Sequence, residues 1–212
     1  MEIARFIFNA FAENTYLLFD ETKECVIIDP GCNNEFEESS LIKFIRNQGL
    51  KPVKLINTHF HIDHVLGNHF ISSQFQLIPE FHEEGMFFFD RQEDIADKYG
   101  MNYNGSKKPE QFLSEGDLIR FGHTTLKVIH VPGHSRDSIC LYNNDDKILI
   151  SGDVLFQGSI GRTDLPGGDY DTLIEGIKTK LFTLDDSTRV FPGHGESTTI
   201  GDEKVYNPFF RY

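Results

Sequence analysis

The sequence contains no tryptophan, only three cysteines, and no apolar run long enough to cross a bilayer. Cys25, Cys32 and Cys140 are odd in number and form no C-x-x-C pair, so we expect no disulfide framework and a reducing compartment. A membrane-spanning helix needs about 20 consecutive apolar residues. Residues 1–5 also lack the basic start and apolar run that are typical of a signal peptide. These absences predict a cytoplasmic protein with no membrane partner.

Positive charge is also scarce. The chain carries 20 Lys and Arg against 33 Asp and Glu, giving a formal net charge of −13. Nucleic acids and anionic membranes bind proteins through basic patches, so we expect neither as a partner. A length of 212 residues with 39% hydrophobic content is enough for one sizeable core.

Strand patterns occur in two blocks, each interrupted by helical patterns. Short runs rich in β-forming residues lie at 5–8, 15–19, 25–29, 53–57 and 76–78, and again at 118–121, 125–131, 138–141, 147–150 and 189–191. Helical spacing of apolar residues covers 35–48, 65–75 and 171–182. We therefore expect two sheets packed together with helices outside, in one domain spanning 1–212.

The stretch 80–109 differs from both blocks. It is highly charged, contains three consecutive phenylalanines at 87–89, and shows no strand period. We predict one or two helices and a loop here, inserted over the functional site.

The most informative stretch is 59–64, which reads His-Phe-His-Ile-Asp-His. Side chains two residues apart in an extended segment point the same way, so His59 and His61 can hold one metal ion together. Asp63 and His64 follow where the chain should turn away from its strand, and they can face a second ion. Imidazole and carboxylate are ligands of zinc, iron and manganese. The spacing therefore predicts a metal site.

Three further candidate ligands follow predicted strands. His134, Asp153 and His194 each come directly after a glycine at a strand end. Glycine permits tight turns and close approach of the backbone to a site. A single Pro-Gly-His or Ser-Gly-Asp triplet is more often an ordinary turn. Their joint occurrence with the 59–64 motif favours a site built along one edge of a sheet.

The order of these motifs resembles that of a known family. The segment 58–64, with the pattern T-H-x-H-x-D-H, is followed by Gly-His, Gly-Asp and Gly-His, as in the metallo-β-lactamase superfamily. Segments 151–156, 161–164 and 207–209 are similar to the short glyoxalase II-like (hydroxyacylglutathione hydrolase-like) branch. The resemblance implies an α+β fold, a four-layer αββα sandwich of two mixed sheets with helices outside. True β-lactamases of the superfamily usually carry cysteine where this chain has Asp153, and they are exported, which argues against antibiotic hydrolysis.

The resemblance also implies a dinuclear centre with two divalent metal ions, zinc first and iron or manganese as alternatives. It places one ion on His59, His61 and His134. It places the second on Asp63, His64 and His194, with Asp153 bridging the two. Asp63 would also orient a metal-bound hydroxide.

Such a centre predicts a hydrolase. Five neutral imidazoles and two carboxylates leave excess positive charge at a bridging water, and zinc can lower the pKa of water from 15.7 to about 7. We find no dedicated general acid near the motifs. A thiolate departs without one because thiols have a pKa of about 8.5. The expected substrate is therefore a small-molecule thioester, and the resemblance points to a hydroxyacylglutathione.

Full-length glyoxalase II enzymes carry a further C-terminal helical domain that helps to bind glutathione. Here 18 residues follow His194, so we expect basic residues elsewhere to bind the substrate. Arg162 is the first candidate, and Arg136 and Lys204 are others. The alternative for Arg162 is a structural ion pair with Asp164 or another acid.

Other functions stay open. A mononuclear iron persulfide dioxygenase would use His59, His134 and Asp153 as a facial triad. A lactonase or another ester hydrolase on this scaffold is a weaker alternative. A non-catalytic zinc-stabilised protein is disfavoured because structural zinc sites are closed by four ligands. The sequence leaves open the metal, the acyl group, the thiol carrier and the oligomeric state.

Overall fold

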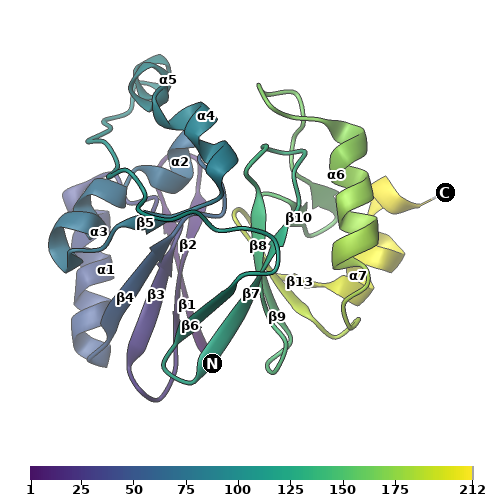
Figure 1. The fold of residues 1–212 in the computed structure, drawn as a ribbon, viewed down its shortest axis with the longest axis horizontal. Coiled ribbons are helices and arrows are strands. Elements are labelled where there is room, and N and C mark those ends of the chain that lie inside the picture. Colours follow the sequence, from purple (N-terminus) through teal and green to yellow (C-terminus); the bar gives the residue numbers. More distant parts are fainter. Residues whose placement is uncertain (212) are drawn as a thin grey trace.

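The computed structural model describes residues 1–211 and has two mixed sheets stacked between two layers of helices (Figure 1). The first sheet has the strand order β1-β2-β3-β4-β5. Its strands are β1 (Glu2–Phe8), β2 (Glu13–Phe19), β3 (Glu24–Ile28), β4 (Lys51–Ile56) and β5 (Pro79–Glu80). The first three pair antiparallel, and β3, β4 and β5 run parallel. This is the αββα sandwich expected from the sequence.

The second sheet has the order β13-β12-β9-β8-β7-β6. Its strands are β6 (Leu118–Phe121), β7 (Thr124–His130), β8 (Ile139–Asn143), β9 (Ile148–Gly152), β12 (Arg189–Pro192) and β13 (Thr198–Thr199). A separate hairpin pairs β10 (Leu155–Phe156) with β11 (Ser159–Ile160). Strands β7, β9 and β12 point the same way, because β8 is antiparallel to both β7 and β9 and β12 is parallel to β9. Their carboxyl ends therefore meet at one edge.

Helices cover the outer face of each sheet (Figure 1). On the first sheet lie α1 (Glu35–Gln48) and α3 (Asn68–Phe75). On the second lie α6 (Tyr170–Gly176), its π-helical continuation Ile177–Leu181, and α7 (Ile200–Tyr206). The main core fills the space between the sheets with side chains such as Leu18, Ile28, Val128 and Leu141, all fully buried. Complete burial of such a side chain contributes about 1.5–3 kcal/mol to stability.

Helix α1 spans the residues predicted for it, because both of its ends are encoded locally. The Asn34 side chain accepts hydrogen bonds from the backbone N–H groups of Phe36 and Glu37, which caps the N-terminus. Gly49, with φ of 66°, ends the helix in the left-handed conformation that glycine tolerates.

The helix predicted over 65–75 is instead two helices, α2 (Ile62–Val65) and α3, separated at Leu66 and Gly67. The Gly67 N–H donates to the carbonyl of Pro30 at 2.7 Å, and a Cβ at Gly67 would lie 2.5 Å from Cys32 Sγ. A contact with a distant segment thus ends α2. The strand predicted at 76–78 lies three residues later, at β5, and α7, β10, β11, β13 and the 3-10 turn Pro208–Phe210 were not predicted.

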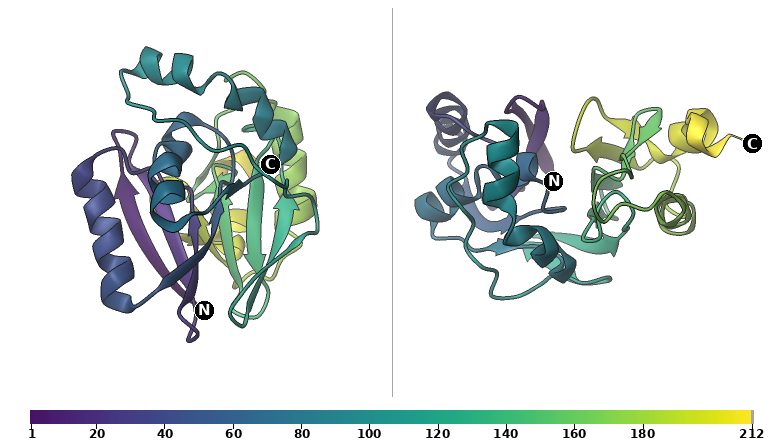
Figure 2. Two further views of the ribbon diagram at one scale, coloured as in Figure 1. Left: turned by 60° about the vertical axis from the view of Figure 1, so that its left-hand side comes forward. Right: turned by 90° about the horizontal axis from the view of Figure 1, so that it is seen from above.

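The charged stretch 80–109 contains a 3-10 turn (Glu83–Gly85), α4 (Met86–Phe89) and α5 (Gln92–Tyr99), followed by a loop. Phe81 and Phe88 of this stretch pack against Phe60, which lies in the 59–64 motif. Figures 1 and 2 show α4 and α5 above the ends of the sheets. Within residues 1–211, no helix has the length and apolar content needed to span a membrane.

Candidate metal centre

The predicted ligands come from four segments at the same end of the sandwich, and two of these ligands, Asp63 and His64, lie in α2. His59, His61, Asp63 and His64 follow β4, whereas His134, Asp153 and His194 follow β7, β9 and β12 respectively. Hydrogen bonds join the two halves of the sandwich at this end: the Ile139 N–H donates to the Thr58 carbonyl at 2.8 Å, and the Asn14 N–H donates to the Gly193 carbonyl at 2.7 Å. His59 and His194, which are 135 positions apart in the sequence, are thereby brought into one cluster.

Three imidazoles form the first group of potential ligands. His134 Nε2 lies 3.3 Å from His59 Nε2 and 3.0 Å from His61 Nδ1. Burial lowers the pKa of all three side chains, well below the usual range for His59 and to about 3 for His61. These imidazoles are therefore neutral near pH 7, which is the form that binds a metal ion.

Asp63, His64 and His194 form the second group. Asp63 Oδ2 lies 3.1 Å from His194 Nε2 and 3.6 Å from His64 Nε2. Burial lowers the pKa of His64, but the negative charges of Asp63 and Asp153 outweigh burial, so this pKa ends well above the usual value. A cation binding here must displace a proton.

Asp153 lies between the two groups. Its Oδ1 lies 3.5 Å from His64 Nε2, and its Oδ2 lies 3.6 Å from His134 Nε2 and 3.5 Å from His194 Nε2. The buried atoms His64 Nε2 and Asp153 Oδ1 have no hydrogen-bond partner among the described residues. Buried polar atoms are nearly always paired, so these two atoms facing each other fit a cation held between them.

Contacts on the far side of the imidazoles fix their orientation. His134 Nδ1 donates to the Arg162 carbonyl at 2.8 Å, and His194 Nδ1 donates to the Phe11 carbonyl at 3.1 Å. His59 Nδ1 lies 3.1 Å from Thr58 Oγ1. Metal-binding histidines commonly use their second nitrogen in this way, which aims the first nitrogen at the ion.

Asp29 is a candidate site residue that the sequence analysis missed. Its carboxylate accepts hydrogen bonds from the Thr58 N–H at 2.7 Å and the Thr58 hydroxyl at 2.6 Å, and it lies 3.1 Å from His64 Nδ1. Asp29 is buried and follows β3 immediately before Pro30 and Gly31. An acid at a strand end, two residues before Gly31, is a signal related to the Gly-Asp pair that identified Asp153.

A cavity of about 520 Å³ opens over the cluster. His61, Asp63, His134, Asp153 and His194 form its polar base. The remaining lining residues come mainly from the loops and from α4 and α5: Phe11, Ile62, Phe88, Ile95, Lys98, Tyr99, Phe156, Arg162, Leu165 and Pro166. Most of these are apolar, so the cavity suits a substrate with an apolar part.

Of the three basic residues predicted to bind substrate, one lines the cavity and two do not. Arg162 lines the cavity, but its guanidinium pairs with Asp164 through Nε at 2.7 Å and Nη2 at 2.8 Å. Arg136 stacks over the Phe87 ring at 4.5 Å, and Lys204 pairs with Asp186. Neither Arg136 nor Lys204 lines the cavity.

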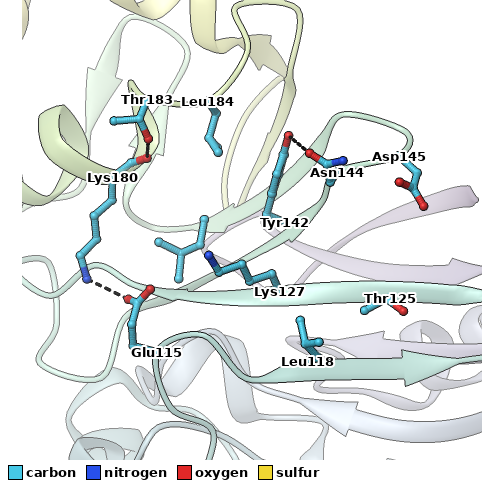
Figure 3. Close-up of a pocket in the computed structure, with 11 residues that line it drawn as sticks. Glu115, Leu118, Thr125, Lys127, Tyr142, Asn144, Asp145, Lys180, Thr183 and Leu184 are labelled. Atoms are coloured by element: carbon cyan, nitrogen blue, oxygen red, sulfur yellow. Dashed lines mark hydrogen bonds and ion pairs between the residues drawn. The ribbon is translucent and has the colours of Figure 1, made fainter.

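A second cavity, of about 610 Å³, lies between the outer face of the second sheet and the helical turn Ile177–Leu181 (Figure 3). Figure 3 shows Lys180 paired with Glu115, at 2.8 Å, and Tyr142 bonded to Asn144. None of the seven candidate metal ligands lines it. Although it is larger, this cavity lacks the convergent unpaired polar groups of the first.

A family profile described as the metallo-β-lactamase superfamily matches residues 9–194. This protein therefore belongs to the metallo-β-lactamase superfamily. A curated relative, hydroxyacylglutathione hydrolase GloC of Haemophilus influenzae, is 38% identical over 202 residues, covering 94% of this chain and 93% of the relative.

Solved structures agree with this fold. The BLEG-1 B3 metallo-β-lactamase has a TM-score of 0.91 at 32% identity, with both chains fully covered. TTHA1623 in a di-iron-bound form has a TM-score of 0.86 at 33% identity, covering 97% of this chain and 99% of that one. ETHE1 from Myxococcus xanthus has a TM-score of 0.78 at 27% identity, covering 98% and 84%.

Proposed function

We propose that this protein is a cytoplasmic dinuclear metal-dependent hydrolase that cleaves small-molecule thioesters of the hydroxyacylglutathione type. One observation carries the proposal: the Asp153 carboxylate lies within 3.6 Å of imidazole nitrogens from both ligand groups. A carboxylate in this position suits two ions better than one. The GloC relative, whose name states hydroxyacylglutathione hydrolysis, supports the substrate class.

The residues assigned to each ion follow from the two groups. His59, His61 and His134 would hold one ion, and Asp63, His64 and His194 would hold the other, with Asp153 shared. Two bound divalent ions, zinc first among the candidates, would supply Lewis acidity that makes water nucleophilic near neutral pH and polarises a carbonyl oxygen.

The side chains around the cavity support water as the nucleophile. Among the described residues that line it, none is serine, threonine or cysteine. Asp63 faces the cavity, and its carboxylate is placed to accept a hydrogen bond from the attacking water and so to orient it. The apolar walls exclude bulk water from the acyl group. A thiolate can leave without being protonated by an acid. This suits a cavity that offers no neutral carboxylic acid to protonate the leaving group.

Hydrolysis of S-lactoylglutathione by metal-loaded protein tests the proposal. We expect turnover in the wild type and a loss of at least about a hundredfold in His59→Ala, because one ligand group is broken. Turnover no higher than that of the variant would reject this substrate. A β-lactam assayed in parallel tests the activity named for the BLEG-1 neighbour, and we expect no hydrolysis.

A mononuclear iron persulfide dioxygenase is the second candidate. His59 Nε2, His134 Nε2 and Asp153 Oδ2 lie in one corner of the cluster, as a facial triad requires. The likeness to ETHE1 gives this candidate some support. Metal content separates the two: two zinc ions per chain favour the hydrolase, and one iron with oxygen consumption on a persulfide favours the dioxygenase. Lactone hydrolysis by the same centre is a weaker alternative, tested by adding a lactone to the assay.

A further inference from the structure

The positive side chains of the cavity differ in how they are paired. Apart from the histidines of the ligand cluster, Lys98 and Arg162 are the two basic residues among the described residues that line the cavity. Both acidic oxygens of Asp164 are already bonded to the Arg162 guanidinium, at 2.7 and 2.8 Å. The Arg162 charge is thus largely neutralised from within the protein, and its donors on that side are occupied.

Lys98 has no such partner. It lies in the last turn of α5, is exposed, and no carboxylate of residues 1–211 lies within ion-pair distance of its ammonium group. The chain has a net charge of −13, so acidic side chains outnumber basic ones, and yet this lysine of the cavity over the ligand cluster has no acidic partner. An ammonium group of this kind is a strong donor for an anion.

The surroundings of Lys98 place it at the rim of the cavity. Its neighbour Tyr99 stacks edge-on against Phe11, with ring centroids 5.4 Å apart, which joins α5 to the loop between β1 and β2. The Phe11 carbonyl in turn holds His194. The helix that carries Lys98 is therefore tied to the ligand loops, and Figure 1 shows α5 above the end of the sandwich where these loops lie.

We propose that Lys98 forms an anion-binding subsite that takes a carboxylate on the thiol carrier of the substrate. The inference deepens the proposed function and rests on it for the reaction, but not for binding. The acyl group would lie over the ligand cluster, the carrier would lie along the apolar wall, and its carboxylate would reach the α5 rim. Lys98 thereby selects thioesters of acidic thiols over thioesters of neutral thiols.

Two substrates with the same acyl group test this subsite. S-lactoylglutathione carries carboxylates on its thiol, whereas S-lactoyl-N-acetylcysteamine carries none. Lys98→Met removes the charge and keeps much of the chain length. We expect it to raise KM for S-lactoylglutathione about three- to fivefold, the upper range for an exposed ion pair, with the effect confined to that substrate. Lys98→Glu should raise KM for S-lactoylglutathione about tenfold. Lys98→Arg, which keeps the positive charge, should have a KM near that of the wild type.

The matched control is Lys43→Met, which removes an exposed lysine of α1 outside this cavity. It makes the same change in net charge and should leave KM for both substrates unchanged. Equal KM values for wild type and Lys98→Met would overturn the subsite. So would an equal rise for both substrates, which would mean lost packing, or an equal rise in Lys43→Met, which would mean a general effect of charge.

Binding separates this inference from the proposed reaction. If the wild type hydrolyses neither thioester, the proposed function fails, and calorimetry with the non-hydrolysable thioether S-hexylglutathione decides the subsite. A Kd three to five times weaker in Lys98→Met than in wild type would sustain it. An unchanged Kd, or no binding to the wild type, would overturn it.

Discussion

Asp29 lies 3.1 Å from Nδ1 of His64, on the side of the imidazole that faces away from the cavity. The same carboxylate accepts two hydrogen bonds from Thr58, the residue that precedes the first candidate ligand. One buried acid at the end of β3 thus fixes the start of the 59–64 motif and its last histidine. Because the two contacts orient both ligand groups, the geometry of the centre depends on a residue that need not touch a metal.

Asp29→Asn should weaken metal binding. The amide keeps the shape but places N–H donors opposite the Thr58 hydroxyl or the His64 ring, so the ring loses its fixed orientation. We expect about 10- to 100-fold lower metal affinity, measured by competition with a chelator. Asp146→Asn, which alters an exposed pair with the N-terminus, is the control and should bind metal normally. Unchanged affinity in Asp29→Asn, with the fold intact by circular dichroism, would contradict this role.

Gly193→Ala should disturb the centre without unfolding the protein. A Cβ at this position would lie 2.2 Å from Asp153 Oδ1 and 2.7 Å from His64 Cε1, so both side chains must move. We expect thioesterase activity to fall at least about a hundredfold because ligand geometry is lost. Gly195→Ala is the matched control: its Cβ meets nothing within 4 Å, although its φ of 74° adds modest strain. Similar activity in the two variants would show that the close approach at Gly193 is unimportant.

His194→Ala should abolish metal binding at one ligand group and preserve it at the other. The variant removes a ligand from the group with Asp63 and His64 and leaves the three imidazoles of the other group in place. We expect metal content, measured by mass spectrometry on dialysed protein, to fall from two ions per chain to one. A mononuclear centre on His59, His134 and Asp153 predicts one ion per chain in both proteins.

Asp20 makes a contribution to stability that depends on pH. Burial raises its pKa, but hydrogen bonds from Thr22, His123 and Thr124 outweigh burial and lower the pKa to about 2. Since the folded pKa lies below the unfolded value of about 3.9, the contribution is complete above pH 4 and is lost as pH falls towards 2.

We therefore expect Asp20→Asn to lower the free energy of unfolding by about 2 kcal/mol at pH 7. Urea unfolding at a series of pH values measures the difference from wild type. The difference should shrink once the pH falls below about 4. A difference that stays constant down to pH 3 would mean that the carboxylate charge is not what stabilises this loop.

The sequence predicted features whose signals are local. Helix α1 carries its own caps at Asn34 and Gly49, and the strand pattern followed burial on the sheet faces. His134, Asp153 and His194 lie together because β7, β9 and β12 end at one edge of the second sheet. The 59–64 motif follows β4 of the first sheet and meets them only because the two sheets pack together.

What the sequence did not predict depends on contacts between distant segments. The break between α2 and α3 arises from the approach of Gly67 to Pro30, and Asp29 meets His64 only after β3 and β4 pair. The position of Lys98 over the cavity depends on how α5 packs, which no periodicity within 80–109 encodes. The ion pair of Arg162 with Asp164, by contrast, was one of the two roles predicted for this arginine, because arginines are commonly paired.

Anomalous diffraction from crystals of the zinc-loaded protein would show directly how many ions the centre holds. We expect two peaks, one among His59, His61 and His134 and one among Asp63, His64 and His194, with the Asp153 carboxylate between them. A single peak at full occupancy, in crystals grown with excess zinc, would contradict a dinuclear centre.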